Sequence, residues 1–395
     1  MTLAHVVIVG ASVAGLTVAE TLRRSGFEGA ITLIGAETRP PYDRPPLSKQ
    51  VLTGEWEIER VALRDLASLE SAGVDVRLGT RAVALDVDAR RVTLDSGERV
   101  GYDGLVVATG VEPRRLGEGQ NLRGAHVLRT VEDALALRAD LRAHGRLAVV
   151  GAGFLGCEVA AVARQAGLEV TLIDPMSVPL QRQLGTGIGG YVASLHREHG
   201  VLLRCGAGVR RLVGDDRVRG VELATGEVVE TDVVLTAIGS VPAVGWLEGS
   251  GLRIDDGVLC DAMCQAAPGV YAAGDVARWW HDGAGGYVRV EHRMNATEQA
   301  IAVARNLIGA AVPFTPIPFF WTDQYDARIQ AYGRFPSGSA MRIVHGDPDE
   351  RRFVARYTHG DRIVGALGWN MARELRAERA HIGFPDPERS VASGS

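Results

Sequence analysis

Three glycines and an aspartate near the middle of the chain have the spacing of a dinucleotide-binding turn. Gly151, Gly153 and Gly156 form a complete G-x-G-x-x-G, and Asp174 follows 23 residues after Gly151. In such a turn the glycines let the backbone approach a pyrophosphate, and the following helix directs free N–H groups and partial positive charge at it. A carboxylate at the position of Asp174 accepts from the ribose hydroxyls of an adenine nucleotide and repels a 2′-phosphate. These residues predict an NADH site that disfavours NADPH.

A second, less regular turn lies near the start of the chain. It reads Gly10-Ala-Ser12-Val-Ala14-Gly15, with a small serine in place of the middle glycine, and its hydroxyl can itself donate to a phosphate. A carboxylate just past the next predicted strand is placed for a ribose contact, and the residue before it offers only its backbone. The residues expected at this second nucleotide are Gly10, Ser12, Ala14, Gly15, Ala36 and Glu37.

Two dinucleotide sites in one chain suggest a transfer between two cofactors. One site would hold a resident flavin dinucleotide and the other a visiting nicotinamide dinucleotide. Hydride transfer between them needs a scaffold that aligns the two rings.

Lys49 is the only lysine among 43 basic side chains, and the other 42 are arginines. It stands in the stretch RPPYDRPPLSKQVL, residues 39–52. Lysine and arginine are interchangeable on a solvated surface but not at a tight site, where the compact ammonium and the planar guanidinium differ. We therefore favour a functional interpretation of Lys49 over that of a surface lysine that has escaped replacement by arginine.

The hydrophobic pattern supplies the elements that position these residues. Apolar runs at 5–10 and 30–37 predict strands on either side of a helix over 11–26, and the pattern returns as strands 146–151 and 169–174 around a helix over 152–167. Two βαβ units therefore lie about 140 residues apart, as in two related nucleotide-binding domains.

Further strands end in glycine-containing turns. The stretch 102–114 contains Thr109-Gly110, its echo 231–244 contains Gly239, and 269–278 contains Gly274-Asp275. From about residue 313 the chain alternates like antiparallel strands, followed by a helix over 370–382. The tail VASGS predicts disorder.

Composition bounds the function. A chain of 395 residues with 46% hydrophobic residues and a net charge of −5 predicts two or three globular domains and no global attraction to nucleic acid or an anionic membrane. The apolar N-terminal stretch lacks a basic region before Arg23, so we interpret it as a strand and helix rather than a signal peptide or anchor. We expect a cytoplasmic protein. The four cysteines have no metal-site spacing and predict reduced structural thiols and no bound metal.

The motifs together resemble a known family. In order they are VVIVGASVAG, PPYDRPPLSK, LVVATG, VVGAGFLGCE, VYAAGDVA and WTDQYD. The chain resembles, from about residue 5 to about residue 385, the FAD-dependent, NADH-using ferredoxin reductases of oxygenase systems, the family that includes putidaredoxin reductase and the reductases of biphenyl-type dioxygenases. The stretches RPPLSK and WTDQYD are the most specific, because the glycine turns are shared by all flavoproteins with two dinucleotide sites.

The resemblance implies an α/β fold with two Rossmann-like dinucleotide-binding domains and a C-terminal α+β domain, in a glutathione-reductase-like layout. It implies an FAD domain over 1–112 and 232–312, an NADH domain over 113–231, and a C-terminal domain over 313–395 that covers the flavin. FAD would be bound through Gly10, Ser12, Ala14, Gly15, Ala36, Glu37, Arg44, Lys49, Ala82, Thr109, Gly110, Arg129, Asp275, Arg293 and Trp321. NADH would be bound through Gly151, Gly153, Phe154, Leu155, Gly156, Glu158, Asp174 and Gly239.

The resemblance also implies the roles of several side chains. Lys49 reaches the flavin N5 region and is paired by Glu158, two residues after the last glycine of the NADH turn; these two are the expected catalytic residues. Trp321 lies against the flavin edge. Arg293 departs from the family, whose members often carry an apolar or aromatic residue there. It either reaches solvent or a nearby carboxylate, or it affects the flavin potential or a partner contact.

The implied activity is electron transfer from NADH through FAD to a small iron–sulfur ferredoxin, which supplies a cytochrome P450 or a Rieske oxygenase. The first helix has no cysteine pair, so no thiol relay is expected and electrons leave directly from the flavin. Alternatives are reduction of rubredoxin or a quinone, an NADH oxidase, and a non-enzymatic flavoprotein that signals NADH to a partner. No nucleic acid or membrane is expected among the partners.

Overall fold

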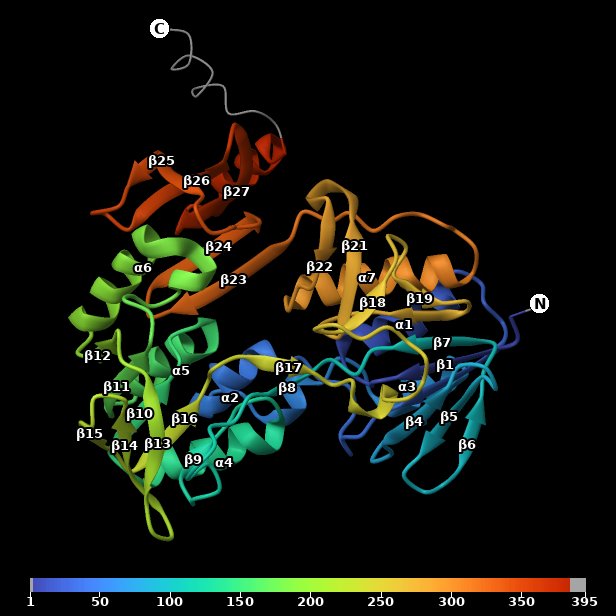
Figure 1. Cartoon of the computed structure of the whole chain (residues 1–395), viewed down its shortest axis with the longest axis horizontal. Helices are drawn as coiled ribbons and strands as arrows, with labels where there is room; N and C mark the ends of the chain where they lie inside the picture. Colours follow the sequence, from blue (N-terminus) through green and yellow to red (C-terminus); the bar gives the residue numbers. More distant parts are fainter. Residues whose placement is uncertain (1–2, 384–395) are drawn as a thin grey trace, which may run out of the picture. The chain divides into compact units, whose positions relative to one another are not determined.

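A computed structural model of the protein describes residues 3–383 (Figure 1). The predicted disordered tail at 391–395 lies outside these residues. The chain forms two compact units. Of the described residues, unit 1 holds those up to Asp43 together with Glu59–Glu112 and Val241–Pro318; unit 2 holds Arg44–Ile58, Pro113–Ser240 and those from Phe319 onward. None of the helices within 3–383 has the length and apolar content needed to cross a bilayer.

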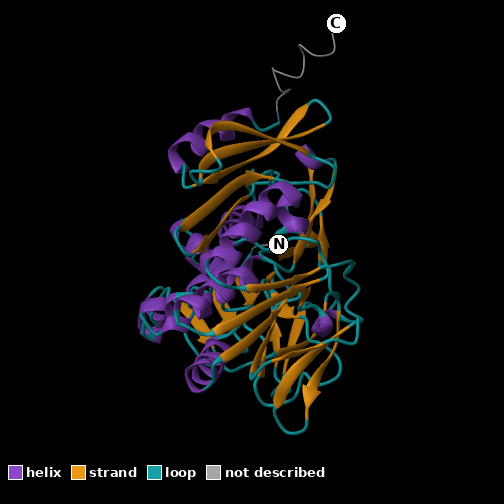
Figure 2. Cartoon of the chain, turned by 90° about the vertical axis from the view of Figure 1, so that its left-hand side faces the viewer, coloured by secondary structure: helices purple, strands orange, loops and turns teal. Residues whose placement is uncertain are grey.

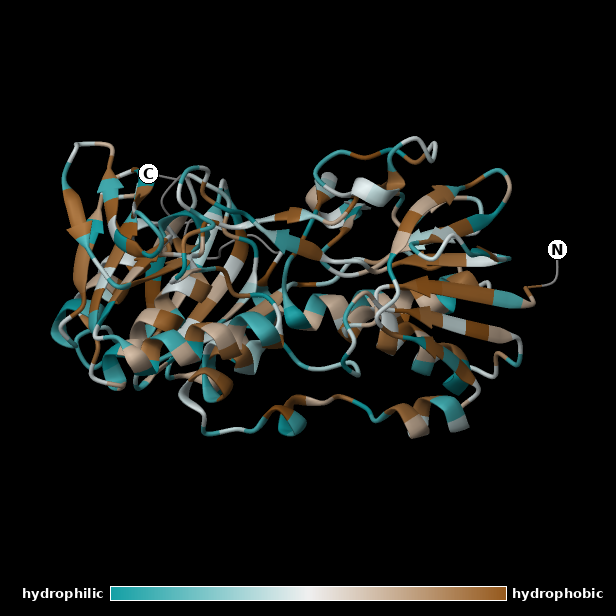
Figure 3. Ribbon diagram, turned by 90° about the horizontal axis from the view of Figure 1, so that it is seen from below, coloured by the Kyte–Doolittle hydropathy of each residue, from teal (hydrophilic) through white to brown (hydrophobic). Residues whose placement is uncertain are grey.

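Unit 1 is built on a six-stranded sheet in the order β19-β20-β7-β1-β2-β3. Its strands are β1 (His5–Val9), β2 (Ala30–Ile34), β3 (Val74–Arg77), β7 (Gly104–Val107), β19 (Gln265–Ala267) and β20 (Val270–Ala272). All neighbours run parallel except β19 and β20. Residues 6–9 of β1 and all of β7 are buried, as the apolar run in β1 requires of a sheet covered on both faces. Figure 3 colours the chain by hydropathy, with hydrophobic residues in brown.

Helices α1 (Val13–Arg24) and α7 (Arg293–Leu307) pack against each other in unit 1. Their buried sides, including Val18, Leu22, Ala300 and Val303, belong to the main hydrophobic core of this unit. The remaining elements are α3 (Leu66–Ser71), a sheet of β4 (Ala82–Asp86), β5 (Arg91–Leu94) and β6 (Arg99–Gly101), and a sheet of β18 (Val258–Cys260), β21 (Ala277–His281) and β22 (Gly286–Val288). Short 3₁₀ turns cover Gly245–Leu247 and Asp282–Ala284.

Unit 2 contains the second parallel sheet, in the order β12-β11-β10-β16-β9. Its strands are β9 (Ala125–His126), β10 (Arg146–Val150), β11 (Glu169–Asp174), β12 (Leu202–Cys205) and β16 (Val233–Thr236). Its helices are α4 (Val131–Ala143), α5 (Phe154–Gln165) and α6 (Gln181–Glu198), the last broken at Gly185. An antiparallel sheet is formed by β13 (Val209–Gly214), β14 (Val218–Leu223) and β15 (Val228–Glu230). The predicted second βαβ unit is therefore present as β10, α5 and β11.

The segment with the single lysine belongs to unit 2, although it interrupts unit 1 in sequence. It forms a 3₁₀ turn, η1 (Pro45–Ser48), and a short helix, α2 (Gln50–Thr53). Helix α2 packs on α4, and Arg138 of α4 donates to the carbonyl of Val51 at 3.2 Å. A further 3₁₀ turn covers Ile58–Val61, and β8 (Val111–Pro113) pairs with β17 (Ser240–Pro242) where the chain passes between the units.

The C-terminal part of unit 2 is a five-stranded antiparallel sheet in the order β23-β24-β27-β26-β25 (Figure 2). The strands are β23 (Phe319–Gln324), β24 (Ala327–Gly333), β25 (Ala340–Asp347), β26 (Arg352–His359) and β27 (Arg362–Trp369). Helix α8 (Ala372–Glu378) and a 3₁₀ turn over Arg379–His381 follow, so the predicted C-terminal helix is divided between them. Along β23 the residues Phe320, Thr322 and Gln324 are buried and share one face, while Phe319 and Trp321 lie on the other.

Candidate functional site: two nucleotide turns and a buried ion pair

The Gly151–Gly156 turn has the tight geometry that its sequence predicts. Gly151 has φ +104°, and a Cβ there would lie 2.3 Å from the carbonyl oxygen of Ala237. A Cβ on Gly156 would lie 1.9 Å from the carbonyl oxygen of Gly151, so only glycine permits this contact between helix and turn. Helix α5 begins at Phe154, and its N-cap residue Gly153 offers no side-chain cap. The first N–H groups of α5 are therefore available to an anion.

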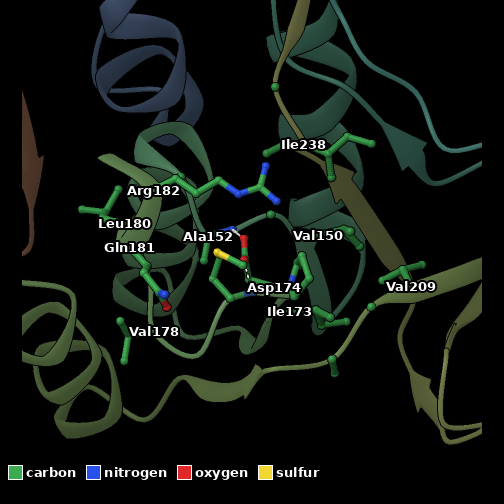
Figure 4. Close-up of a pocket in the computed structure, with 18 of the residues that line it drawn as sticks. Val150, Ala152, Ile173, Asp174, Val178, Leu180, Gln181, Arg182, Val209 and Ile238 are labelled. Carbon is green, nitrogen blue, oxygen red and sulfur yellow. Dashed lines mark hydrogen bonds between the residues drawn. The ribbon is translucent and has the colours of Figure 1, made fainter. Parts of the chain in front are cut away.

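A pocket of about 410 Å³ opens at this turn. Asp174 lies at the end of β11 and points into the pocket, where its two carboxylate oxygens accept from the N–H groups of Ala152 and Met176, each at 2.7 Å (Figure 4). A carboxylate has about four lone-pair sites, so acceptor capacity remains for ribose hydroxyls. The pocket is lined by Gly151, Ala152, Gly153, Asp174, Met176, Gln181, Arg182, Ile238 and Gly239, among others. Of the predicted NADH residues, the turn glycines Gly151 and Gly153, Asp174 and Gly239 thus line one cavity.

Arg182 is a pocket residue that the motifs did not single out. It lies in the first turn of α6 and extends its guanidinium over the pocket (Figure 4). Within the described part of the chain it makes no ion pair, so its charge is available to an anionic ligand. One arginine among 42 carries no distinguishing signal. Its place at the start of the helix after the Asp174 strand was the only available clue.

The first nucleotide turn, in unit 1, repeats the same construction. Gly10 has φ +117°, and a Cβ on Gly15 would lie 1.9 Å from the carbonyl oxygen of Gly10. Ser12 is the N-cap of α1, yet its side chain makes no capping hydrogen bond. The N–H groups of the first turn of α1, including that of Ala14, are therefore open to a phosphate.

Two other predicted turns lie against this one at the carboxyl ends of β7 and β20. A Cβ on Gly10 would lie 2.1 Å from the carbonyl oxygen of Ala108, which places Thr109 and Gly110 beside the turn. On the opposite side of β7, a Cβ on Gly274 would lie 3.1 Å from the Cβ of Ala14. The N–H of Gly274 donates to Gln299 at 2.9 Å, which fixes the turn that carries Asp275. Ligands of open parallel sheets bind at such strand ends.

The remaining predicted residues of unit 1 are more dispersed. Glu37 accepts from the hydroxyl of Tyr42, and Ala36 precedes it after β2. Ala82 is the buried first residue of β4. Arg293, the residue that departs from the family, donates from Nε to Asp43 Oδ1 at 2.5 Å. This is the contact with a nearby carboxylate that stood among the alternatives for Arg293.

Lys49 and Glu158 form a close ion pair within unit 2. The Nζ of Lys49 lies 2.5 Å from Oε2 of Glu158, and the two side chains are only 14% and 9% exposed. Ser48 donates to the same carboxylate oxygen at 2.7 Å, and Thr322 of β23 donates to Oε1 at 2.8 Å. The family resemblance implied the pair but named neither of the two hydroxyl donors.

The other predicted residues of unit 2 make contacts on elements next to this ion pair. Arg44 donates to the carbonyl of Arg129 at 2.5 Å, which joins the two arginines assigned to FAD. Phe154, at the start of α5, has its ring 5.0 Å from that of Phe320, and Leu155 follows it in the same turn. Trp321 stacks on Phe319 with ring centroids 6.0 Å apart, on the face of β23 opposite Thr322.

The cysteines have the properties of structural thiols. All four are free, and Cys157, Cys260 and Cys264 are buried. Burial raises the pKa of Cys157 and Cys260 well above the usual value, and raises the pKa of Cys264 to about 12. Burial also raises the pKa of Cys205. A thiol must ionise to be a nucleophile or a metal ligand, and within residues 3–383 no cluster of three or more His, Cys, Asp or Glu side chains is suited to a metal ion.

The fold and the two turns define the class of protein as a two-dinucleotide α/β oxidoreductase. Residues 4–300 match the family model described as pyridine nucleotide-disulphide oxidoreductase, and residues 319–386 match the model described as reductase C-terminal. The chain belongs to the pyridine nucleotide-disulphide oxidoreductase family and, within it, to the ferredoxin–NAD(+) reductases of oxygenase systems. The family and the fold class predicted from the motifs are confirmed.

Its relatives resemble it over nearly their whole length. It is 40% identical to the ferredoxin–NAD(+) reductase component of the anthranilate 1,2-dioxygenase system of Burkholderia cepacia, covering 97% of this chain and 96% of that one. It is 37% identical to rhodocoxin reductase of Rhodococcus erythropolis, covering 95% and 88%. Among solved structures, the covalent putidaredoxin reductase–putidaredoxin complex matches with a TM-score of 0.91 at 33% identity, covering 95% and 92%.

Proposed function

We propose that the protein is an NADH:ferredoxin oxidoreductase, which uses FAD to pass electrons to a small iron–sulfur ferredoxin that supplies a cytochrome P450 or a Rieske oxygenase. The observation that carries this proposal is the presence of two uncapped nucleotide turns, at α1 and at α5, in a chain that matches a ferredoxin–NAD(+) reductase over 97% of its length. We place it in the cytoplasm.

The residues of unit 1 fit FAD. The uncapped start of α1, the glycines that bring the turn close to β7, and the adjoining turn with Asp275 form an anion-accepting cradle at the ends of parallel strands. When bound, FAD accepts two electrons as a hydride, carries negative charge in its reduced ring and releases electrons singly. We assign 1–112 and 232–312 to FAD binding, 113–231 to NADH binding and 313–395 to the C-terminal domain.

The pocket of unit 2 fits NADH. The N–H groups at the start of α5 hold the pyrophosphate, and the Asp174 carboxylate accepts from the adenosine ribose. Two backbone hydrogen bonds keep that carboxylate in the pocket, so binding of the ribose loses little further entropy in orienting it. Gly239 and the glycines of the turn leave room for the dinucleotide backbone.

Lys49 supplies a compact positive charge that stabilises the reduced ring, and Glu158 holds Lys49 in place. The pair is nearly buried, so the carboxylate offsets the cost of desolvating the ammonium. An arginine would need more space and more hydrogen-bond acceptors than Ser48 and Glu158 provide. This requirement explains why a lysine stands here in a chain that otherwise uses arginine.

Electrons leave without a thiol step. The four cysteines are free, and burial raises the pKa of each. These thiols are therefore unsuited to act as a two-electron disulfide acceptor within the protein. A one-electron iron–sulfur acceptor on a separate protein fits the proposed chemistry.

Steady-state assays with a panel of acceptors test the proposal. The flavin-loaded protein and NADH are combined with a [2Fe–2S] ferredoxin, a rubredoxin, a quinone or oxygen alone, and each initial rate is measured. The proposal predicts the highest kcat/KM with a ferredoxin. A higher kcat/KM with rubredoxin, quinone or oxygen refutes the proposal that ferredoxin is the acceptor. Slow turnover with every ferredoxin favours a signalling flavoprotein instead.

A further inference from the structure

A continuous chain of buried hydrogen bonds begins at the carboxylate of Glu158 and leads away from Lys49. Its first link is the hydroxyl of Thr322, which donates to Glu158 Oε1 at 2.8 Å. The carboxamide of Gln324 then donates to the hydroxyl oxygen of Thr322 at 3.3 Å. The Nε2 of His196 lies 3.0 Å from the carbonyl oxygen of Gln324. The exposed fractions of Thr322, Gln324 and His196 are 0%, 1% and 0%.

The chemistry of the donors sets the direction of every link. The carbonyl oxygen of Gln324 can only accept, so the proton of the His196 ring is on Nε2. Burial lowers the pKa of His196 to about 4, so the ring is neutral near pH 7 and its Nδ1 is an acceptor. The hydroxyl of Tyr325 lies 3.3 Å from that Nδ1 and donates to it. All the hydrogens of the chain therefore point toward Glu158.

The far end of the chain is anchored on helix α6. Tyr325 is the first residue of the two-residue turn between β23 and β24, and it has φ +55°. That conformation is unfavourable for a bulky side chain and usually belongs to glycine or asparagine. The ring is held by the bond to His196 and by stacking on His199, with centroids 3.7 Å apart and planes at 13°. The strain persists because these contacts fix the ring.

This series of hydrogen bonds is unsuited to carrying protons. The amide of Gln324 gives a hydrogen through nitrogen and accepts one through oxygen, so it cannot pass a proton on as a hydroxyl or water does. A carboxylate with one oxygen fixed by Thr322 and the other by Ser48 and Lys49 has, however, no freedom to rotate. The consequence of the chain is therefore the orientation of Glu158 and, through it, of Lys49.

We propose that Thr322, Gln324 and His196 are positioning residues for the Lys49–Glu158 pair, by which the C-terminal sheet sets the geometry of the charged group. This inference rests on the role of the pair in the proposed function. It predicts that loss of one hydroxyl on β23 disturbs the lysine that stands between η1 and α2, although Thr322 makes no hydrogen bond or ion pair with Lys49.

Lys49 is its own reporter, because the chain has only one lysine. The full-length, flavin-loaded protein is labelled with ¹⁵N-lysine, and the single side-chain ammonium signal is recorded. In parallel, the rate of Lys49 acetylation is measured by peptide mass spectrometry. Neither measurement depends on turnover. The variants are Thr322→Val, which keeps the shape and removes the donor, and Thr322→Ser, which restores it. Thr231→Val is the matched control, because Thr231 is an equally buried threonine of unit 2 that donates to backbone carbonyls.

Thr322→Val is expected to broaden or shift the ammonium signal and to speed acetylation about 3- to 10-fold, because a hydrogen bond to a charged group is lost. It is expected to slow flavin reduction by NADH by a similar factor with little change in the KM for NADH. Thr322→Ser should restore both values, and Thr231→Val should change neither. If Thr322→Val does not fold, Gln324→Met tests the same chain and should give a smaller effect of the same kind.

An unchanged ammonium signal and acetylation rate in folded Thr322→Val would overturn the inference. Equal effects of Thr322→Val and Thr231→Val would also overturn it, since they would reflect general loosening. Failure of the proposed function has a different signature, in which the wild-type flavin is not reduced by NADH at all.

Discussion

Replacing Asp174 by serine should weaken the preference for NADH and open the pocket to NADPH. Asp174 is fixed at the end of β11 by hydrogen bonds from the N–H groups of Ala152 and Met176, and its carboxylate points into the pocket. Serine removes the negative charge and retains a small hydroxyl. Arg182 remains in the same pocket, without an ion pair among the described residues, and can then pair with a 2′-phosphate.

The magnitude follows from the two contributions of the carboxylate. A charge-assisted hydrogen bond to the ribose contributes about 1.5–3 kcal/mol, so the KM for NADH should rise about 10- to 100-fold. A phosphate about 4 Å from a carboxylate is repelled by about 1–4 kcal/mol in an environment between water and a protein surface. Removal of that repulsion should lower the KM for NADPH about 5-fold or more. The ratio of kcat/KM for the two coenzymes should therefore change by about two to three orders of magnitude.

The assay is the steady-state reduction of a ferredoxin, or of ferricyanide, with each coenzyme varied in turn. The matched control is Arg182→Gln in the Asp174→Ser background, which should reduce the gain with NADPH to the part that comes from the lost repulsion and leave the KM for NADH nearly as in the single variant. Circular dichroism checks that the loss of the hydrogen bonds from Ala152 and Met176 has not unfolded the protein.

A wild-type ratio of kcat/KM for NADH and NADPH in Asp174→Ser would refute the role of Asp174 in coenzyme choice. A gain with NADPH that is unchanged when Arg182 is replaced would refute the role of Arg182, because the phosphate would then be held by another group.

Three further predictions concern other parts of the protein. Lys49→Arg should slow flavin reduction by NADH about 10-fold or more in stopped-flow measurements, since a guanidinium does not fit the partners of the ammonium; a rate equal to that of the wild type would show that a guanidinium can replace the ammonium. His196 has its pKa lowered by burial to about 4, so the unfolded state binds more protons between pH 6.5 and 4; stability is fully present above pH 6.5 and falls as the pH drops through this window, by up to about 3 kcal/mol. Urea unfolding across that range should show a slope that His196→Gln reduces, and an identical slope in the variant would contradict the burial argument. Ellman's reagent at pH 8 should modify at most one thiol of the native protein, the partly exposed Cys205, and all four after denaturation; rapid reaction of more than one native thiol would contradict the structural role of the cysteines.

The nucleotide turns were predictable because their determinants are local. Gly10 and Gly151 each follow a buried strand and precede a helix without a side-chain cap, and the glycine spacing expresses that geometry directly. The two βαβ units, the antiparallel C-terminal sheet and the place of Asp174 could be read from the same kind of pattern. The family resemblance added the Lys49–Glu158 pair, whose members lie too far apart in sequence for any spacing rule.

Other features depend on three-dimensional packing: Thr322 and Ser48 stand in the specific stretches WTDQYD and RPPLSK, but nothing in those stretches indicates which side chain they contact. Thr322 and His196 belong to β23 and α6, and only the contacts among α5, α6 and β23 bring them into one chain of hydrogen bonds. Ser48 stands next to Lys49 in the sequence and was not assigned a role of its own. The grouping of 44–58 with unit 2 follows from the packing of α2 on α4, since the segment interrupts unit 1 in sequence. Arg182 was indistinguishable among the many arginines.

Electron transfer from NADH through FAD is tested most simply by an anaerobic titration of the purified, full-length protein with NADH, followed by absorbance and then by addition of an oxidised ferredoxin. We expect a yellow protein with one FAD per chain, whose flavin band bleaches with one equivalent of NADH and returns when two equivalents of ferredoxin are added. A protein that binds no FAD when supplied with it, or whose flavin band is unaffected by NADH, would contradict the proposed transfer of electrons from NADH to FAD.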